Sequence, residues 1–122
     1  MTKGITTTAT VRPFTVPAPP VQVAEDSWSR AGWDAGWEHL RLRIIATIPS
    51  PECSHSWEQC ARHCPDWAAW RAKIDARMTE LAPVAARAIE WSQSRGAEGN
   101  GYFGTRSCWI NSAIRAVDAL AI

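Results

Sequence analysis

The sequence predicts a mainly α-helical protein, a small helical bundle of about four helices, one of them short, preceded by an extended N-terminal arm. Three observations predict this fold. Apolar residues recur every three or four positions over three segments after residue 25. The first 24 residues combine four prolines with a run of threonines, which disfavours a helix there. The length of 122 residues suits one modest core, so we expect a single domain over 25–122.

Residues 1–24 are the predicted arm. It holds the run Thr6–Thr8 and then prolines that interrupt a sheet ladder, so we expect extended chain with room for one edge strand near residues 5–11. An extended segment makes no hydrogen bonds within itself, so it is ordered only where it contacts another surface. The sequence leaves open a disordered tail, docking on this domain and docking on a partner.

The first long helix is expected to start where Glu25, Asp26 and Ser27 supply capping side chains, and to end before Pro49. Its apolar stripe has spacings of four, three, four and four: Trp33, Trp37, Leu40, Ile44 and Ile48. The piece from Leu40 to Ile44 also alternates like a strand, and we favour helix because the longer period includes it. Gly32 and Gly36 lie one turn apart and could let another backbone approach closely.

Three further elements follow. Ser56 and Gln59 form a capping box that predicts a short helix to about Cys64. Pro65 and Asp66 open the longest helix, which Pro83 is expected to kink or split. Its apolar stripe is Trp67, Trp70, Ile74, Met78, Leu81, Ala85 and Ile89. A glycine-rich loop over 96–104 leads to a last helix starting near 105–107. The inward positions of that helix are Ile110, Ala113, Ile114, Val117 and Ala121.

Cysteine and histidine cluster before the longest helix. Cys53, His55, Cys60 and Cys64 could close a tetrahedron around zinc, with His63 as an alternative donor. Four protein ligands would leave no open coordination position, so this zinc would be structural. The spacing departs from the usual two close pairs of zinc ligands. Disulfide pairing and thiols packed in a small core therefore stay open beside the zinc hypothesis.

Eight tryptophans are the most distinctive part of the composition. Trp28, Trp91 and Trp109 fall beside or away from the apolar stripes of their helices, which makes them candidate exposed binding anchors. The alternative is that the bend at Pro83 and the arm cover them. Arg106, at the expected start of the last helix, could hold a phosphate or carboxylate together with backbone amides.

Charge and hydropathy exclude several classes of protein. The net charge is +1, so no global basic field favours nucleic acid. No apolar run approaches the roughly 20 residues that span a bilayer, which predicts no membrane partner. The first residues lack the apolar core of a secretory signal, so we expect a cytoplasmic protein with reduced cysteines.

The function we expect is binding of another protein by a non-enzymatic module, because candidate anchors and an arm are present and no catalytic set is recognisable. In general style the chain looks like the small accessory or inhibitor proteins of phages and mobile elements in GC-rich bacteria, and that similarity covers no specific motif.

Two alternative functions remain. One is a nucleic-acid-binding regulator with a structural zinc and a basic strip of Arg62, Arg71, Lys73 and Arg77. The other is a cysteine-dependent enzyme that uses Cys108 near Arg106, where a helix start lowers a thiol pKa.

Overall fold

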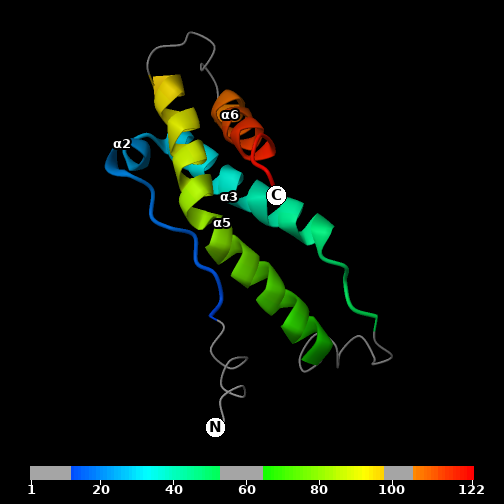
Figure 1. Cartoon of the computed structure of the whole chain (residues 1–122). Coiled ribbons are helices and arrows are strands. Elements are labelled where there is room, and N and C mark those ends of the chain that lie inside the picture. Colours follow the sequence, from blue (N-terminus) through cyan, green and yellow to red (C-terminus); the bar gives the residue numbers. More distant parts are fainter. Residues whose placement is uncertain (1–11, 53–64, 98–105) are drawn as a thin grey trace.

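The computed structural model describes residues 12–52, 65–97 and 106–122. Figure 1 shows four helices in these ranges: α2 (Val21–Ala24), α3 (Ser27–Thr47), α5 (Pro65–Ala97) and α6 (Arg106–Asp118). The same ranges contain no strand. The prediction of a mainly α-helical small bundle is therefore confirmed. The expected helix over 56–64 and the edge strand near 5–11 fall outside the residues that the structure describes.

The described part of the arm is extended from residue 12 to Pro20, and the chain then turns into α2. The prediction of extended chain through residue 24 is wrong over Val21–Ala24. The prolines that forbid a helix end at Pro20, which is the N-cap of α2. Val23 is only 1% exposed and belongs to the core, so burial of one side chain fixes this single turn.

Helix α3 begins as its capping residues predict. The Asp26 carboxylate accepts hydrogen bonds from the backbone N–H groups of Trp28 and Ser29, at 2.8 and 3.2 Å. The helix continues through Leu40 and Ile44, both fully buried, so the strand-like alternation of this piece does not form a strand. It ends at Thr47, two residues before Pro49.

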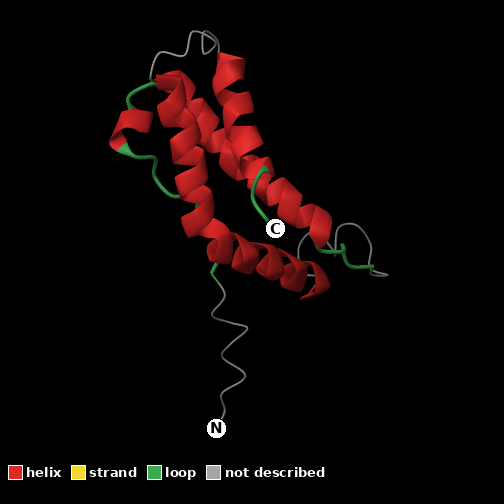
Figure 2. Ribbon diagram, turned by 45° about the horizontal axis from the view of Figure 1, so that its top comes forward, coloured by secondary structure: helices red, strands yellow, loops and turns green. Residues whose placement is uncertain are grey.

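Helix α5 runs through Pro83 without a break, and Figure 2 shows that it bends near its middle instead of splitting. Four of its predicted core positions are at most 1% exposed: Ile74, Met78, Ala85 and Ile89. The other three predicted positions, Trp67, Trp70 and Leu81, are half-buried. The Trp70 indole donates to the Ile48 carbonyl at 3.1 Å, which joins the beginning of α5 to the end of α3.

Helix α6 packs against both long helices. Ala113 and Val117 are fully buried, as the sequence predicts, whereas Ala121 lies beyond the helix and is exposed. Ser112 Oγ donates to the Ser92 carbonyl of α5 at 3.4 Å. Figure 1 shows α6 alongside the C-terminal half of α5. The core therefore lies between three helices.

The crossing of α3 and α5 depends on missing side chains. A Cβ on Gly32 would overlap the side-chain amide of Gln93, and a Cβ on Gly36 would meet Ile89 at 2.9 Å. The two helices run antiparallel here, because the earlier glycine faces the later α5 residue. Gln93 is 1% exposed, and its Nε2 donates to the Trp109 carbonyl at 3.2 Å, so this amide links α5 to α6 as well. The two glycines thus admit α5 side chains close to the α3 backbone, whereas the sequence predicted the approach of another backbone.

Candidate binding surfaces

The cysteine and histidine cluster cannot be placed. Its four predicted zinc ligands, Cys53, His55, Cys60 and Cys64, lie in the segment 53–64, outside the described residues. Within the described ranges, no group of three or more histidine, cysteine, aspartate or glutamate side chains is arranged to hold a metal ion. The zinc hypothesis stays a prediction from the sequence.

The three candidate tryptophan anchors differ in exposure. Trp91 is 59% exposed and Trp28 is 40% exposed, in agreement with their positions away from the apolar stripes. Trp109 is only 5% exposed, so the prediction that it is an exposed anchor is wrong. Trp109 is buried although it lies near the edge of the apolar stripe, so α6 is covered over more than that stripe.

Trp91 and Val84 share the outward face of α5. They are seven residues apart, which places them about 20° from each other on a helix and Trp91 about 160° from the buried Ile89. Val84 is 46% exposed. Arg87 lies between them on the same side and is also exposed. We call Val84, Arg87 and Trp91 the outer face of α5.

The start of α6 has two residues that the sequence singled out. Arg106 is the first residue of α6 and is exposed, and Cys108 is half-buried in the first turn. Residues 98–105, which precede Arg106, lie outside the described residues.

The structure describes only part of the predicted basic strip, and one of the described cations is paired with a carboxylate. Arg62 lies outside the described residues, whereas Arg71 and Lys73 are exposed on α5. Arg77 makes an ion pair with Glu80 at 2.8 Å. The strip is therefore interrupted by a carboxylate of its own helix, which weakens its attraction for a phosphate backbone.

The described part of the arm docks on this domain. The Trp33 indole on α3 donates to the Pro17 carbonyl at 2.9 Å. The Phe14 ring packs on the Trp37 ring with centroids 5.6 Å apart and planes tilted by 37°. Pro20, with φ −58° and ψ 157°, has the polyproline II conformation. Of the three alternatives left open for the arm, residues 12–20 show docking in cis.

A hollow of about 260 Å³ remains between the arm, α3 and α5. Its apolar lining consists of Phe14, Val16, Trp37 and Met78. The charged part of its lining comes from one side of α3, namely Asp34, Glu38 and Arg41. A mixed apolar and acidic hollow of this kind suits an amphipathic ligand of positive charge.

Sequence reasoning missed this hollow. Asp34 and Glu38 look like ordinary surface carboxylates, and nothing local shows that Phe14 folds back beside them. Two features of the sequence could have indicated a site here. Asp34 and Glu38 are four residues apart, which places both on one side of α3, and Trp37 lies between them in the sequence. These features identify a helix face and not a cavity, because the arm supplies the other wall.

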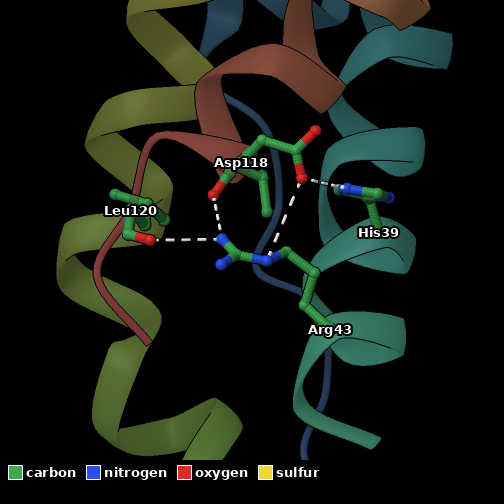
Figure 3. A network of polar contacts seen from close by, with 5 residues as sticks. His39, Arg43, Asp118 and Leu120 are labelled. Atoms are coloured by element: carbon green, nitrogen blue, oxygen red, sulfur yellow. Dashed lines mark hydrogen bonds and ion pairs between the residues drawn. The ribbon is translucent and has the colours of Figure 1, made fainter. Parts of the chain in front are cut away.

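A polar network joins α3 to the end of α6, as Figure 3 shows. The Arg43 guanidinium donates through one nitrogen to the carbonyls of Val117 and Leu120, at 2.6 and 3.2 Å. The Asp118 carboxylate lies 2.7 Å from His39 Nε2 and 3.9 Å from Arg43 Nε through the same oxygen. Arg43 thus caps carbonyls at the C-terminus of α6, where cationic groups are stabilising.

This network is a structural clamp. His39 and Asp118 form a pair of the kind that orients a base in hydrolases, yet Arg43 shares the carboxylate and uses its own guanidinium on the backbone. No serine, threonine or cysteine is joined to His39 by a hydrogen bond in the described chain. The described contacts of these residues are those that stabilise a helix end.

Comparison with known proteins gives no relative. No protein-family model matches the chain, and neither the curated proteins nor the solved structures contain a match. None of the helices in the described ranges is long and apolar enough to cross a membrane. The candidate sites therefore stand on their own geometry.

Proposed function

We propose that this chain is a non-enzymatic module that binds another protein through the outer face of α5. The observation that carries the proposal is the exposure of Trp91, at 59%, on the same side of the helix as Val84 and Arg87. Tryptophan and arginine are the residues most enriched among interface hot spots. Valine supplies apolar area next to them.

The opposite side of the same helix supports this role. Ala85 and Ile89 are completely buried, and Ile89 packs against the backbone of α3 at Gly36. The outer face is consequently carried by a helix whose position is fixed by the core. A partner would meet a surface formed in advance, which lowers the entropy cost of binding.

Trp28 is not part of the main contact that we propose. It is 40% exposed and follows the N-cap of α3, so its backbone N–H is already bonded to Asp26. It lies on a different helix from the outer face of α5. We therefore assign the main contact to α5 and use Trp28 as the matched control.

Affinity purification with matched variants tests the proposal. The full chain, Trp91→Ala and Val84→Ser serve as baits in a lysate of the source organism, with Trp28→Ala as the control tryptophan change. We expect one reproducible set of proteins that both α5 variants lose and the Trp28 variant retains. Exposed substitutions change stability by only about 0.5 kcal/mol, so circular dichroism should show intact folds.

The expected binding must be direct and stoichiometric. A captured protein is therefore produced in pure form and titrated with each variant by calorimetry, where Trp91→Ala should weaken binding at least about tenfold, as hot-spot truncations do. An identical set of captured proteins for all three variants would contradict the assignment to α5.

The two other functions predicted from the sequence have their own discriminating measurements. A nucleic-acid-binding regulator would show affinity for DNA or RNA that falls steeply with salt, through release of counterions. A cysteine-dependent enzyme would show much faster alkylation of Cys108 than of an ordinary thiol at neutral pH. Both remain predictions.

A further inference from the structure

The hollow between the arm, α3 and α5 is a second candidate site, independent of the outer face of α5. One wall is the arm, with Phe14 and Val16, and the floor is formed by Trp37 and Met78, both at most 1% exposed. The arm is fixed there through its contacts with Trp33 and Trp37. The hollow is therefore built by packing of distant segments.

Two carboxylates in the lining have no partner among the residues that the structure describes. Asp34 and Glu38 are exposed, lie one turn apart on α3, and make no hydrogen bond or ion pair with any described residue. Arg41, the one cation among the described residues of the lining, is already paired with Asp75 of α5 at 3.3 Å. The local charge available to a ligand is consequently negative.

One residue of the lining also carries a buried donor that has no acceptor among the described residues. Trp37 lines the hollow, is 1% exposed, and its indole N–H has no hydrogen-bond partner among the described residues. An unpaired buried donor costs stability, so a ligand that brings an acceptor gains from satisfying it. The indole nitrogen is buried, so a ligand reaches it only if the lining moves. The carboxylates are accessible without such a movement.

We propose that this hollow binds a lysine side chain from a protein partner. The lysine stem is apolar and would lie against Phe14 and Val16, while its ammonium has three donors that can bridge carboxylates from two residues. Arginine fits less well, because its planar fork is suited to a single carboxylate. The backbone carbonyl of the same segment supplies the acceptor that Trp37 lacks, which favours a peptide over a free alkylamine.

The test uses the full chain labelled with ¹⁵N and follows the indole N–H signal of Trp37. The probe is a lysine whose two ends are blocked as amides, compared with the equally blocked norleucine, which has the same stem without the charge. We expect a saturable shift of the Trp37 signal with the lysine probe, weaker at high salt, and no saturable shift with norleucine. Equal shifts from the two probes, or none from lysine, would overturn the proposal.

Two double variants test whether lysine binding depends on the carboxylates of the hollow. Asp34→Asn combined with Glu38→Gln should weaken lysine binding about tenfold or more, because each replaced group is the charged partner of a hydrogen bond. Asp66→Asn combined with Glu25→Gln changes two exposed carboxylates outside the lining and should leave binding unchanged. A loss of the same size in both double variants would assign the shift to general charge and refute the site.

A third probe distinguishes a lysine side chain of a protein from a free alkylamine. n-Butylamine has the stem and the charge of lysine but no amide carbonyl. It should bind more weakly than blocked lysine and should shift the Trp37 indole signal less. Equal affinity and equal shifts for the two probes would show that the hollow recognises amines in general, which would overturn the assignment to a protein partner.

Discussion

Helix α3 is held by two contacts of opposite physical character. At its crossing with α5, Gly32 and Gly36 remove side chains so that Gln93 and Ile89 fill the space against the backbone. At the end of α6, Arg43 and Asp118 use charge and hydrogen bonds that are partly open to water. Dispersion and burial act in the first contact, and electrostatics act in the second.

The difference predicts how each contact fails. A packed crossing resists salt and pH but fails when volume is added, because the interior has no room to relax. A polar clamp tolerates changes of volume but weakens when a charge is removed or screened. Volume changes at Gly36 and charge changes at the end of α6 should therefore separate the two kinds of stabilisation.

The largest effect is expected from Gly36→Leu. The added side chain would occupy space that Ile89 already fills, with 2.9 Å between the new Cβ and the isoleucine side chain. Overpacking costs about 1–3 kcal/mol and more when several carbons are added, so we expect a loss of about 3 kcal/mol. Urea unfolding monitored by tryptophan fluorescence measures it.

A smaller substitution at Gly36 tests whether this position and Ile89 compete for the same space. Gly36→Ala gains about 1 kcal/mol of helix propensity and meets the same clash, so the two terms oppose each other. Adding Ile89→Val removes a terminal methyl group at the contact and should restore stability beyond the sum of the single variants. Additive effects of the two substitutions would show that Gly36 and Ile89 do not compete for the same space.

The next effect is expected from Arg43→Ala. It removes the donor to the Val117 and Leu120 carbonyls, and hydrogen bonds from charged groups contribute about 1.5–3 kcal/mol. Water can reach this helix end, so the cost should lie near the lower figure. Hydrogen exchange should show faster exchange of the Ala119 and Leu120 amides, which close the last turn.

Arg30→Ala is the matched control for this variant. Arg30 is exposed on the same helix, and its side chain makes no hydrogen bond or ion pair with the described residues. Its replacement should leave the exchange rates at residues 119–120 unchanged. Faster exchange in both variants would mean that general loss of positive charge, and not the cap, controls the end of α6.

The sequence predicted the parts of the fold that depend on local periodicity. The apolar stripe of α3 and its Asp26 cap repeat at helical spacing, and the glycines one turn apart indicated a close approach before any partner helix was known. The bend at Pro83 is also local, since proline removes a hydrogen bond within its own helix.

The parts that could not be predicted depend on pairing between distant segments. Trp109 lies near the edge of its own stripe, and its burial depends on contacts that the pattern of its own helix does not reveal. The hollow beside Asp34 exists only because Phe14 folds back from 20 residues earlier. A single sequence contains no signal for such pairings beyond general hydrophobicity.

The smallest effect is expected from Asp118→Asn, and it tests the comparison most directly. The carboxylate is 55% exposed, and one oxygen faces both His39 and Arg43. Asparagine keeps a hydrogen-bond acceptor there and removes only the charge, so the cost should be about 0–1 kcal/mol, as for surface ion pairs.

The dependence of stability on salt distinguishes Asp118→Asn from the Gly36 variants at the crossing of α3 and α5. At 1 M salt the screening length falls to about 3 Å, so the difference between the wild type and Asp118→Asn should disappear. The difference for Gly36→Leu arises from overlap of atoms and should persist at the same salt concentration. Urea unfolding of both variants at low and high salt measures the two differences. If salt reduced the Gly36→Leu effect as strongly as the Asp118→Asn effect, the division into a packed and a polar contact would be wrong.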